Sequence, residues 1–315
     1  MGDAKRKKDA PISGPKLTVH RVVVLEWLRD AVEEPKTGTI LVNKLLQTAP
    51  GLPVTCHRCT SASDVLDRIK ALIEEMEAPG AGVPILHIEA HGYSPTGEGD
   101  SAIGLKGPSQ HGTQEALLWK DLADPLRRLN IATRFNLIFV AAACWGDSAL
   151  YEVHSEGTDI RPLPFLISIG FATTVMSHRM ESAMVEFYSK LLLDHLSLQE
   201  SLEHADSKLD RTTEGLARHS LPKIIRSAAI DTVRSFMDPV RNEVNYLHML
   251  ANLAIVGKKP IPRDEYHRRQ LTHVPGAVEK VVGALLAYDV LPENKERFGF
   301  DGKKLAAEAK RKLRI

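Results

Sequence analysis

The chain has 315 residues, of which 43% are hydrophobic and 26% are charged, so it is neither disordered throughout nor a fibrous protein. Its 41 Lys and Arg against 40 Asp and Glu leave a net charge of +1, which excludes bulk charge as a means of binding nucleic acid or a membrane surface. The longest apolar stretch, 137–145, has about half the length of a membrane-spanning helix, and no apolar signal core follows the N-terminal charges. We therefore expect a cytoplasmic protein whose three cysteines are reduced thiols, since they are too few to staple a chain of this length.

At about 150 residues per domain, the length suggests roughly two domains. Residues 1–16 contain a basic run at 5–8 and no apolar period, so we expect a disordered, solvated tail. Beyond this tail, β-branched apolar runs alternate with amphipathic patterns. Strands are predicted at 22–25, 54–58, 83–90, 102–105, 136–143 and 165–175, and helices at 38–47, at 64–78 after an N-cap at Ser63, at 119–129 and at 181–209.

Strands that alternate with helices predict an α/β fold with a mostly parallel central sheet and helices on both faces. The continuous apolar run at 136–143 is typical of a central strand that is covered on both sides. After about residue 211 no strand pattern appears, and helices are predicted at 223–237, 240–256 and 277–287, separated by prolines. We therefore divide the chain into an α/β domain over 17–215 and a helical region over 216–315, which we expect to bind a partner or to regulate the first domain.

Two reactive side chains follow predicted strands. His91, with Gly92 behind it, comes after the strand at 83–90, and Cys144 comes after the strand at 136–143. In an open parallel sheet, functional groups gather outside the carboxyl ends of the strands. If these two strands are neighbours, the thiol and the imidazole meet at one edge of the sheet.

A thiol beside an imidazole can act as a nucleophile, because the thiolate is the reactive form and the imidazole can later protonate a leaving amine. Gly92 has no Cβ, so a substrate carbonyl could approach its N–H, which with the N–H of Cys144 would form an oxyanion hole. Trp145 and Gly146 would make the turn that exposes the sulfur. Cys144 taken alone has another interpretation, because buried cysteine is common in central strands as a small apolar residue.

Both motifs resemble those of a known group of enzymes. The segments PILHIEAHG (84–92) and FVAAACWG (139–146) are similar to the His-Gly and Cys-x-Gly motifs of the caspase-like cysteine peptidases, and His91 precedes Cys144 by about 50 residues, as in the caspases. The closest similarity is to the bacterial CHAT group, in which another His often stands four residues before the motif, as His87 does here. The segments FYSKLL (187–192) and SLQESLEHA (197–205) resemble the helix pair after the last core strand of that group. The resemblance covers roughly 17–210.

The resemblance implies a caspase-type α/β/α sandwich in which Cys144 is the nucleophile and His91 is the general acid/base, with no cofactor and no metal. Many relatives that cleave after basic residues have an acidic residue at the position of Ala142, so a carboxylate for such a substrate would come from elsewhere, with Asp147 and Asp100 as candidates. Ser177 and His178 stand where the resemblance puts a substrate-binding edge.

The resemblance also implies a biological setting. Bacterial relatives often act in defence or programmed-death circuits under the control of a sensor, so we expect a protein substrate and a regulatory or sensor protein as partners. We expect no membrane partner and no direct binding of nucleic acid. The polar segment 147–164 follows the nucleophile and could be an activation loop or a site of self-cleavage.

Three alternatives stay open. The first is a metal-dependent hydrolase, because three possible ligands alternate along one predicted strand and would face one side: His87, Glu89 and His91. A C-x-x-C motif also occurs at 56–59, but it precedes these residues, whereas in zinc deaminases the cysteine pair follows the His-x-Glu motif. A helical ribonuclease built on Arg268 and His273 rests on their spacing alone, and Pro275 argues against a continuous helix there. A catalytically silent caspase-like scaffold would bind partners without cleaving them.

Overall fold

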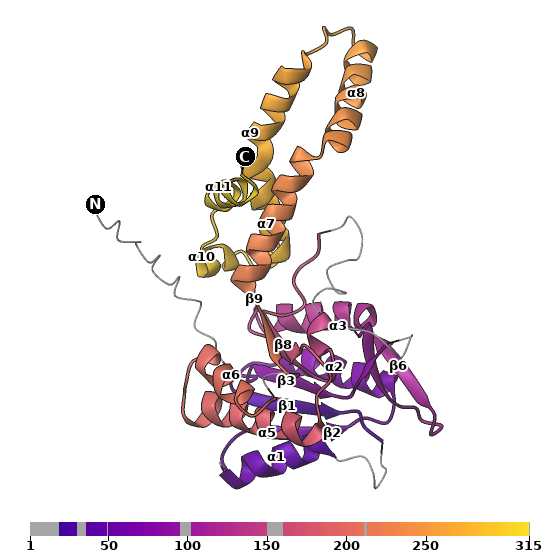
Figure 1. Cartoon of the computed structure of the whole chain (residues 1–315), viewed down its shortest axis with the longest axis vertical. Coiled ribbons are helices and arrows are strands. Elements are labelled where there is room, and N and C mark those ends of the chain that lie inside the picture. Colours follow the sequence, from indigo (N-terminus) through magenta and orange to yellow (C-terminus); the bar gives the residue numbers. More distant parts are fainter. Residues whose placement is uncertain are drawn as a thin grey trace, which may run out of the picture.

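The structure is a computed structural model, and it describes residues 19–29, 36–48, 50–94, 102–149, 160–210 and 213–314. An α/β part and a helical arm stand end to end (Figure 1). The main sheet has the strand order β2-β1-β3-β7-β8-β9, and all neighbouring strands in it are parallel except β8 and β9. Its strands are β1 (Arg21–Glu26), β2 (Val54–Arg58), β3 (Pro84–Glu89), β7 (Ile138–Ala142), β8 (Ile167–Phe171) and β9 (Leu216–Ser220). The basic tail expected over 1–16 lies outside the described residues.

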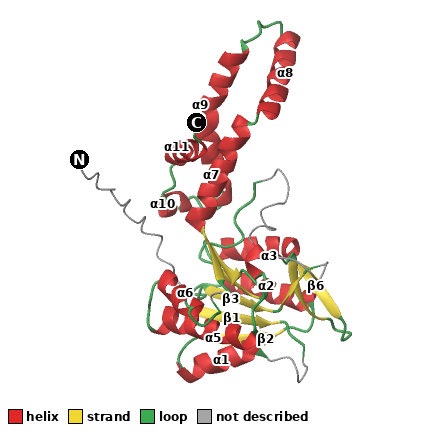
Figure 2. Cartoon of the chain, viewed as in Figure 1, coloured by secondary structure: helices red, strands yellow, loops and turns green. Residues whose placement is uncertain are grey.

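The centre of this sheet is covered on both faces. Every residue of β3, β7 and β8 is buried, as expected for strands between two helical layers. Figure 2 shows helices on both sides of the sheet. One layer holds α1 (Thr37–Thr48), α5 (Ser177–Tyr188) and α6 (Leu198–Asp206), and the other holds α2 (Ala62–Met76) and α3 (Trp119–Ala132). The predicted α/β class with a mostly parallel sheet is confirmed.

The expectation that no strand follows residue 211 is wrong. β9 pairs antiparallel with β8 at the edge of the sheet, so the sheet extends past residue 215 and the helical arm begins at Leu221. Leu216, Ala217 and Arg218 are only half-buried at this edge, and the sequence LARHS accordingly has no apolar alternation. The predicted helix at 181–209 is also interrupted: α5 runs into a π-helical turn at Ser189–Leu193, and α6 starts separately at a capping box formed by Ser197 and Glu200.

A second, small sheet follows β3. It contains β4 (His91–Tyr93), β5 (Gly104–Pro108) and β6 (Gln114–Leu118), paired antiparallel in that order. Only one short strand at 102–105 was predicted there, since these segments are rich in glycine and polar residues and have no long apolar run. His91 therefore begins a strand of the small sheet and does not continue β3.

The arm consists of helices alone (Figure 2). Its members are α7 (Leu221–Met237), α8 (Pro239–Ile255), α9 (Arg263–Leu285), α10 (Asn294–Phe298) and α11 (Gly302–Leu313). The helices α7, α9 and α11 pack together around fully buried valines of α9, whereas α8 extends beside the first half of α9 and has no buried residue. The predicted break at Pro275 is wrong, because α9 continues through this residue. None of the helices in the described ranges is long and apolar enough to cross a bilayer.

Contacts of α10 and of the end of α9 fix the arm to the α/β part. Arg297 donates to the side-chain oxygen of Asn136 over 2.6 Å, and the rings of Phe298 and Phe135 meet edge to face at 6.4 Å. The N–H of Leu163 donates to the carbonyl of Leu285 at 2.9 Å. The arm is thereby anchored to the connection between α3 and β7 and to the segment that precedes β8.

The N-cap of α2 is Ser61 and not the predicted Ser63, because the Ser61 hydroxyl accepts a hydrogen bond from the N–H of Asp64 at 3.1 Å. We expect Ser61→Ala to lower the free energy of unfolding by about 1 kcal/mol, the usual value of such a cap. The matched variant Ser63→Ala removes an exposed hydroxyl that lies 2.9 Å from the Ser61 hydroxyl but does not cap the helix, and it should have at most half that effect. Denaturant unfolding of both variants measures this, and equal losses would contradict the assignment.

Candidate active site

The structure places His91 and Cys144 at the same edge of the main sheet. β3 and β7 are neighbours, and Glu89, the last residue of β3, is in register with Ala142, the last residue of β7. His91 and Cys144 each follow two residues later, beyond the carboxyl ends of these strands. The condition that the two strands are neighbours in the sheet is therefore confirmed.

Gly92 brings the two segments into direct contact. A Cβ on Gly92 would overlap the carbonyl oxygen of Cys144, so only glycine permits this approach of the two backbones. The reason for a glycine here differs from the predicted one, because the space is taken by a carbonyl of the protein itself. A role of the N–H groups of Gly92 and Cys144 as an oxyanion hole stays a prediction.

A tight turn follows Cys144, as the sequence suggested. Trp145 has a φ of +59°, and the N–H of Gly146 donates back to the carbonyl of Ala143 at 3.0 Å. Gly146 is buried against the carbonyl of Ala141, where a Cβ has no room. Cys144 is half-buried in this turn, and His91 is exposed.

The loop after β8, residues 172–176, borders Cys144. The Cys144 thiol lies 3.8 Å from the carbonyl oxygen of Val175, and the N–H of Trp145 donates to the carbonyl of Thr173 at 3.2 Å. The position of the sulfur therefore depends on the position of this loop.

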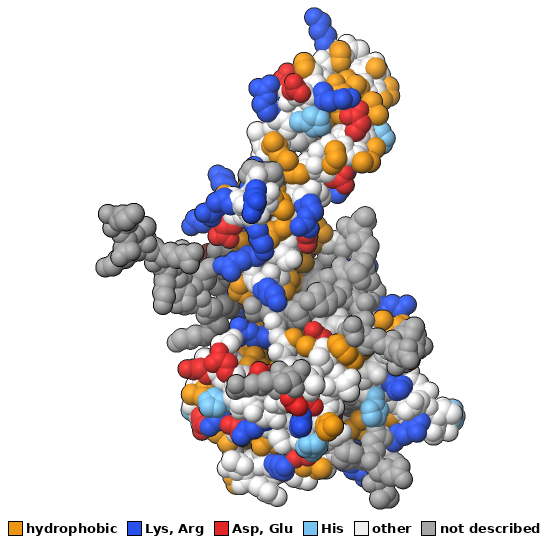
Figure 3. Space-filling model, viewed as in Figure 1, with side chains coloured by type: hydrophobic (Ala, Val, Ile, Leu, Met, Phe, Trp, Pro, Cys, Tyr) orange, Lys and Arg blue, Asp and Glu red, His pale blue; other side chains and the backbone are white. Residues whose placement is uncertain are grey.

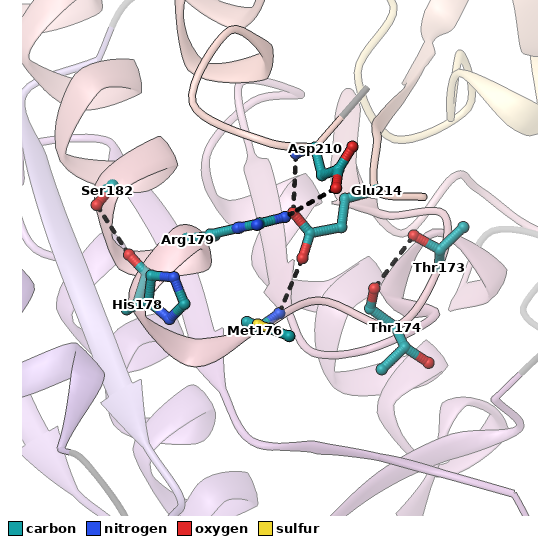
Figure 4. Close-up of polar contacts among 8 residues, drawn as sticks. All are labelled: Thr173, Thr174, Met176, His178, Arg179, Ser182, Asp210 and Glu214. Carbon is teal, nitrogen blue, oxygen red and sulfur yellow. Dashed lines mark hydrogen bonds and ion pairs between the residues drawn. The ribbon is translucent and has the colours of Figure 1, made fainter. Parts of the chain in front are cut away.

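A buried carboxylate holds the loop in place (Figure 4). Glu214, whose side chain is 4% exposed, accepts hydrogen bonds from the N–H of Met176 at 3.2 Å, from the N–H of Asp210 at 3.0 Å and from the Arg179 guanidinium at 3.2 Å. Arg179 also lies 3.4 Å from the Asp210 carboxylate. Burial by itself would raise the pKa of Glu214, but these three donors hold it below its usual value, so the carboxylate stays ionised.

Sequence reasoning missed this group, which we call the Glu214 clamp (Arg179, Asp210 and Glu214). Its members come from the first turn of α5 and from the segment before β9, and no local motif links them. The strand β9 brings them together, because the N–H of Ala172 donates to the carbonyl of Gly215 at 2.9 Å beside the pairing of β8 with β9. Because β9 was not predicted from the sequence, the Glu214 clamp could not be predicted either.

The structure describes three of the four remaining predicted substrate residues. Ser177 and His178 form the exposed first turn of α5, directly after the loop. Asp147 is half-buried in the short 3-10 turn Gly146–Ser148, where burial raises the pKa of its carboxyl. Asp100 and residues 150–159 of the expected activation segment lie outside the described residues. A role for these residues in substrate binding stays a prediction.

The three side chains of the alternative metal site do not share one strand. β3 ends at Glu89, and His91 belongs to β4. His87 is fully buried, with Nδ1 2.9 Å from the Tyr188 hydroxyl and Nε2 3.3 Å from a Glu89 oxygen. Among the residues that the structure describes, no group of three or more His, Cys, Asp or Glu side chains is arranged to hold a metal ion.

A second buried carboxylate accompanies Glu89. Glu26, the last residue of β1, is in register with Glu89 and accepts hydrogen bonds from the N–H and the hydroxyl of Thr39, both at 2.8 Å. Gly38 lies against both carboxylates. The positive end of the α1 dipole therefore faces two buried acids, which fixes the start of α1 next to the functional edge.

Comparisons with known proteins give no family for this chain: no family model matches it, and no curated protein is significantly similar to it.

The three thiols differ in environment, which predicts an order of alkylation. Burial and, after it, the charge of Glu26 raise the pKa of Cys56 to about 11, and burial raises that of Cys59 to about 12, so few thiolates form there near neutral pH. We expect iodoacetamide to label Cys144 at least about tenfold faster than either, measured by peptide mass spectrometry over time. Unfolded protein, in which all three should react alike, is the control. Faster labelling of Cys56 would contradict this picture.

We expect Glu214→Gln to loosen the loop over 172–176, because the charge-assisted bonds of the clamp are lost. Amide hydrogen exchange at Met176 and Trp145 should speed up about tenfold, which mass spectrometry of their peptides measures. The control Glu203→Gln removes an exposed carboxylate of α6 and should leave both peptides unchanged. Unchanged exchange in Glu214→Gln would show that the clamp does not hold the loop.

Proposed function

We propose that this protein is a cysteine endopeptidase of the caspase-like type, closest to the CHAT group, which cleaves a protein substrate with Cys144 and His91. The observation that carries the proposal is the contact of Gly92 with the Cys144 carbonyl. It supports the pairing of thiol and imidazole, because the residues that carry them are joined through adjacent backbones at the carboxyl edge of the sheet. The half-buried thiol and the exposed His91 agree with access for a polypeptide.

The chemistry follows from the two side chains. His91 takes the proton of the Cys144 thiol, and the thiolate attacks the carbonyl carbon of a peptide bond. The oxyanion that forms is stabilised by backbone N–H donors, with those of Gly92 and Cys144 as candidates. His91 then gives its proton to the leaving amine as the C–N bond breaks, and an acyl-enzyme remains. Water, deprotonated by His91, attacks the thioester and releases the second product and the thiolate.

Regulation and setting belong to the same proposal. The helical arm would bind a regulatory or sensor protein, in a cytoplasmic circuit of the kind in which bacterial relatives act in defence. Relatives specific for basic residues have an acidic residue at the position of Ala142. Among the described residues after Cys144, the first carboxylate in the sequence is that of Asp147. Its raised pKa makes it a weaker partner for a cationic substrate side chain than an exposed acid would be.

Activity is tested with Cys144→Ala and His91→Asn against a proteome-derived peptide library, with cleavage products identified by mass spectrometry. We expect each variant to lose cleavage by about 1,000-fold or more, since both groups act as one unit. The matched variants Cys56→Ala and His111→Asn, the latter at the second His-Gly of the chain, should keep activity. Equal cleavage by Cys144→Ala and the unchanged protein would exclude the peptidase and leave a caspase-like binding protein.

A further inference from the structure

The distal helix of the arm carries apolar side chains that face solvent. Val240 is 73% exposed, Leu247 is 53% exposed and Ile255 is 81% exposed, although each is large and apolar. Figure 3 shows apolar side chains gathered over this end of the arm. Single exposed apolar residues are common, but a contiguous group on one helix marks an interaction site.

Val240 and Leu247 belong to a line of apolar side chains along α8, which we call the α8 stripe: Val240, Val244, Leu247, Ala251 and Ala254. Ile255 lies next to the end of this line. The spacing of the five stripe residues alternates between three and four residues, the period of a helix that packs along another helix. All five are exposed. The stripe is thus a packing seam without a packing partner in the described parts of this chain.

The opposite side of α8 fixes its rotation. The Tyr246 ring lies 5.4 Å from the Tyr266 ring of α9, with the Arg263 guanidinium 5.3 Å from its centre, and the Tyr246 hydroxyl donates to the carbonyl of Ile261 at 3.1 Å. At 3.6 residues per turn, residue 246 is turned by about 160° from residue 244 and by about 100° from residue 247, so its contacts with α9 lie off the stripe. The contacts with α9 therefore hold the α8 stripe toward solvent.

We propose that the α8 stripe binds the α8 stripe of a second copy of this chain, antiparallel and centred on Leu247. The two halves of the stripe differ in size, with valines in the first half and alanines in the second. In the antiparallel arrangement, Val240 lies opposite Ala254 of the second copy and Val244 lies next to its Ala251. On either side of the central Leu247 pair, a valine then meets an alanine, so large side chains face small ones in both outer parts of the seam.

Charge favours the same arrangement. Arg241 and Glu243 are the charged side chains of α8, and both lie in its first half. Glu243 is paired with the Arg263 guanidinium of α9 at 2.6 Å, so Arg241 is the charge that decides the direction of the pair. A parallel pair in register would place Arg241 beside its own copy, and like charges repel. The antiparallel pair places it beside the uncharged second half of the other helix.

The area of the seam predicts a weak, reversible dimer. A helix of 17 residues is about 25 Å long and about 10 Å wide. Such a strip is smaller than the roughly 800 Å² that each partner buries in a standard stable interface. We therefore expect monomers at low concentration and dimers at high concentration or when copies are held close together.

Sedimentation velocity of the full chain over a range of concentrations tests this proposal without reference to peptidase activity. We expect a concentration-dependent dimer that Leu247→Glu weakens at least about tenfold, because two like charges then face each other at the centre. Asn245→Glu adds the same charge at an exposed position off the stripe and should leave the dimer intact. Mixing Leu247→Glu with Leu247→Lys should restore association.

The direction of the pair is tested by crosslinking. A mixture of Val240→Cys and Ala254→Cys proteins should give a disulfide between residues 240 and 254, identified by mass spectrometry, whereas each variant alone should not link through its new cysteine. Links of 240 to 240 would overturn the antiparallel arrangement. A monomer at all concentrations, or a dimer unaffected by Leu247→Glu, would overturn the second copy as the occupant.

Discussion

The approach of Gly92 to the Cys144 carbonyl is the constraint on which the candidate site depends. It exists because β3 and β7 are parallel neighbours in a register that ends both strands at one edge. Without a side chain at residue 92, the β4 strand, whose first residue is His91, can start directly over the turn after β7. A single missing Cβ therefore joins two segments that the sequence separates by about 50 residues.

Two polar arrangements stabilise this edge. In the core, His87 contacts Glu89 and the Tyr188 hydroxyl at the end of α5, and Glu26 accepts hydrogen bonds at the start of α1. At the first turn of α5, the Glu214 clamp holds the loop that borders the sulfur. Buried polar groups that are fully paired make a structure more rigid, and rigidity at a nucleophile favours one orientation of the attacking atom.

Much of the main sheet could be predicted, because a continuous apolar run such as 136–143 indicates a strand that is buried on both faces. The same runs located His91 and Cys144, each at the end of one. The sequence did not predict the elements that form through contacts with distant segments. These are β9, with the sequence LARHS, and most of the glycine-rich sheet of β4 to β6. The clamp was missed with β9, since Glu214 meets Arg179 only when that strand is in the sheet. The pattern of apolar residues in a segment indicates which of its side chains are buried, but not which distant side chains they contact.

The most direct test of the central claim is a crystal structure of the full chain after reaction with a peptidyl acyloxymethyl ketone. The account predicts a covalent bond to the Cys144 sulfur, with a ring nitrogen of His91 at hydrogen-bond distance, about 2.6–3.2 Å, from the sulfur or the reacting carbonyl. A His91 ring turned away from the bound peptide, or an inhibitor attached to Cys56 or Cys59, would contradict it.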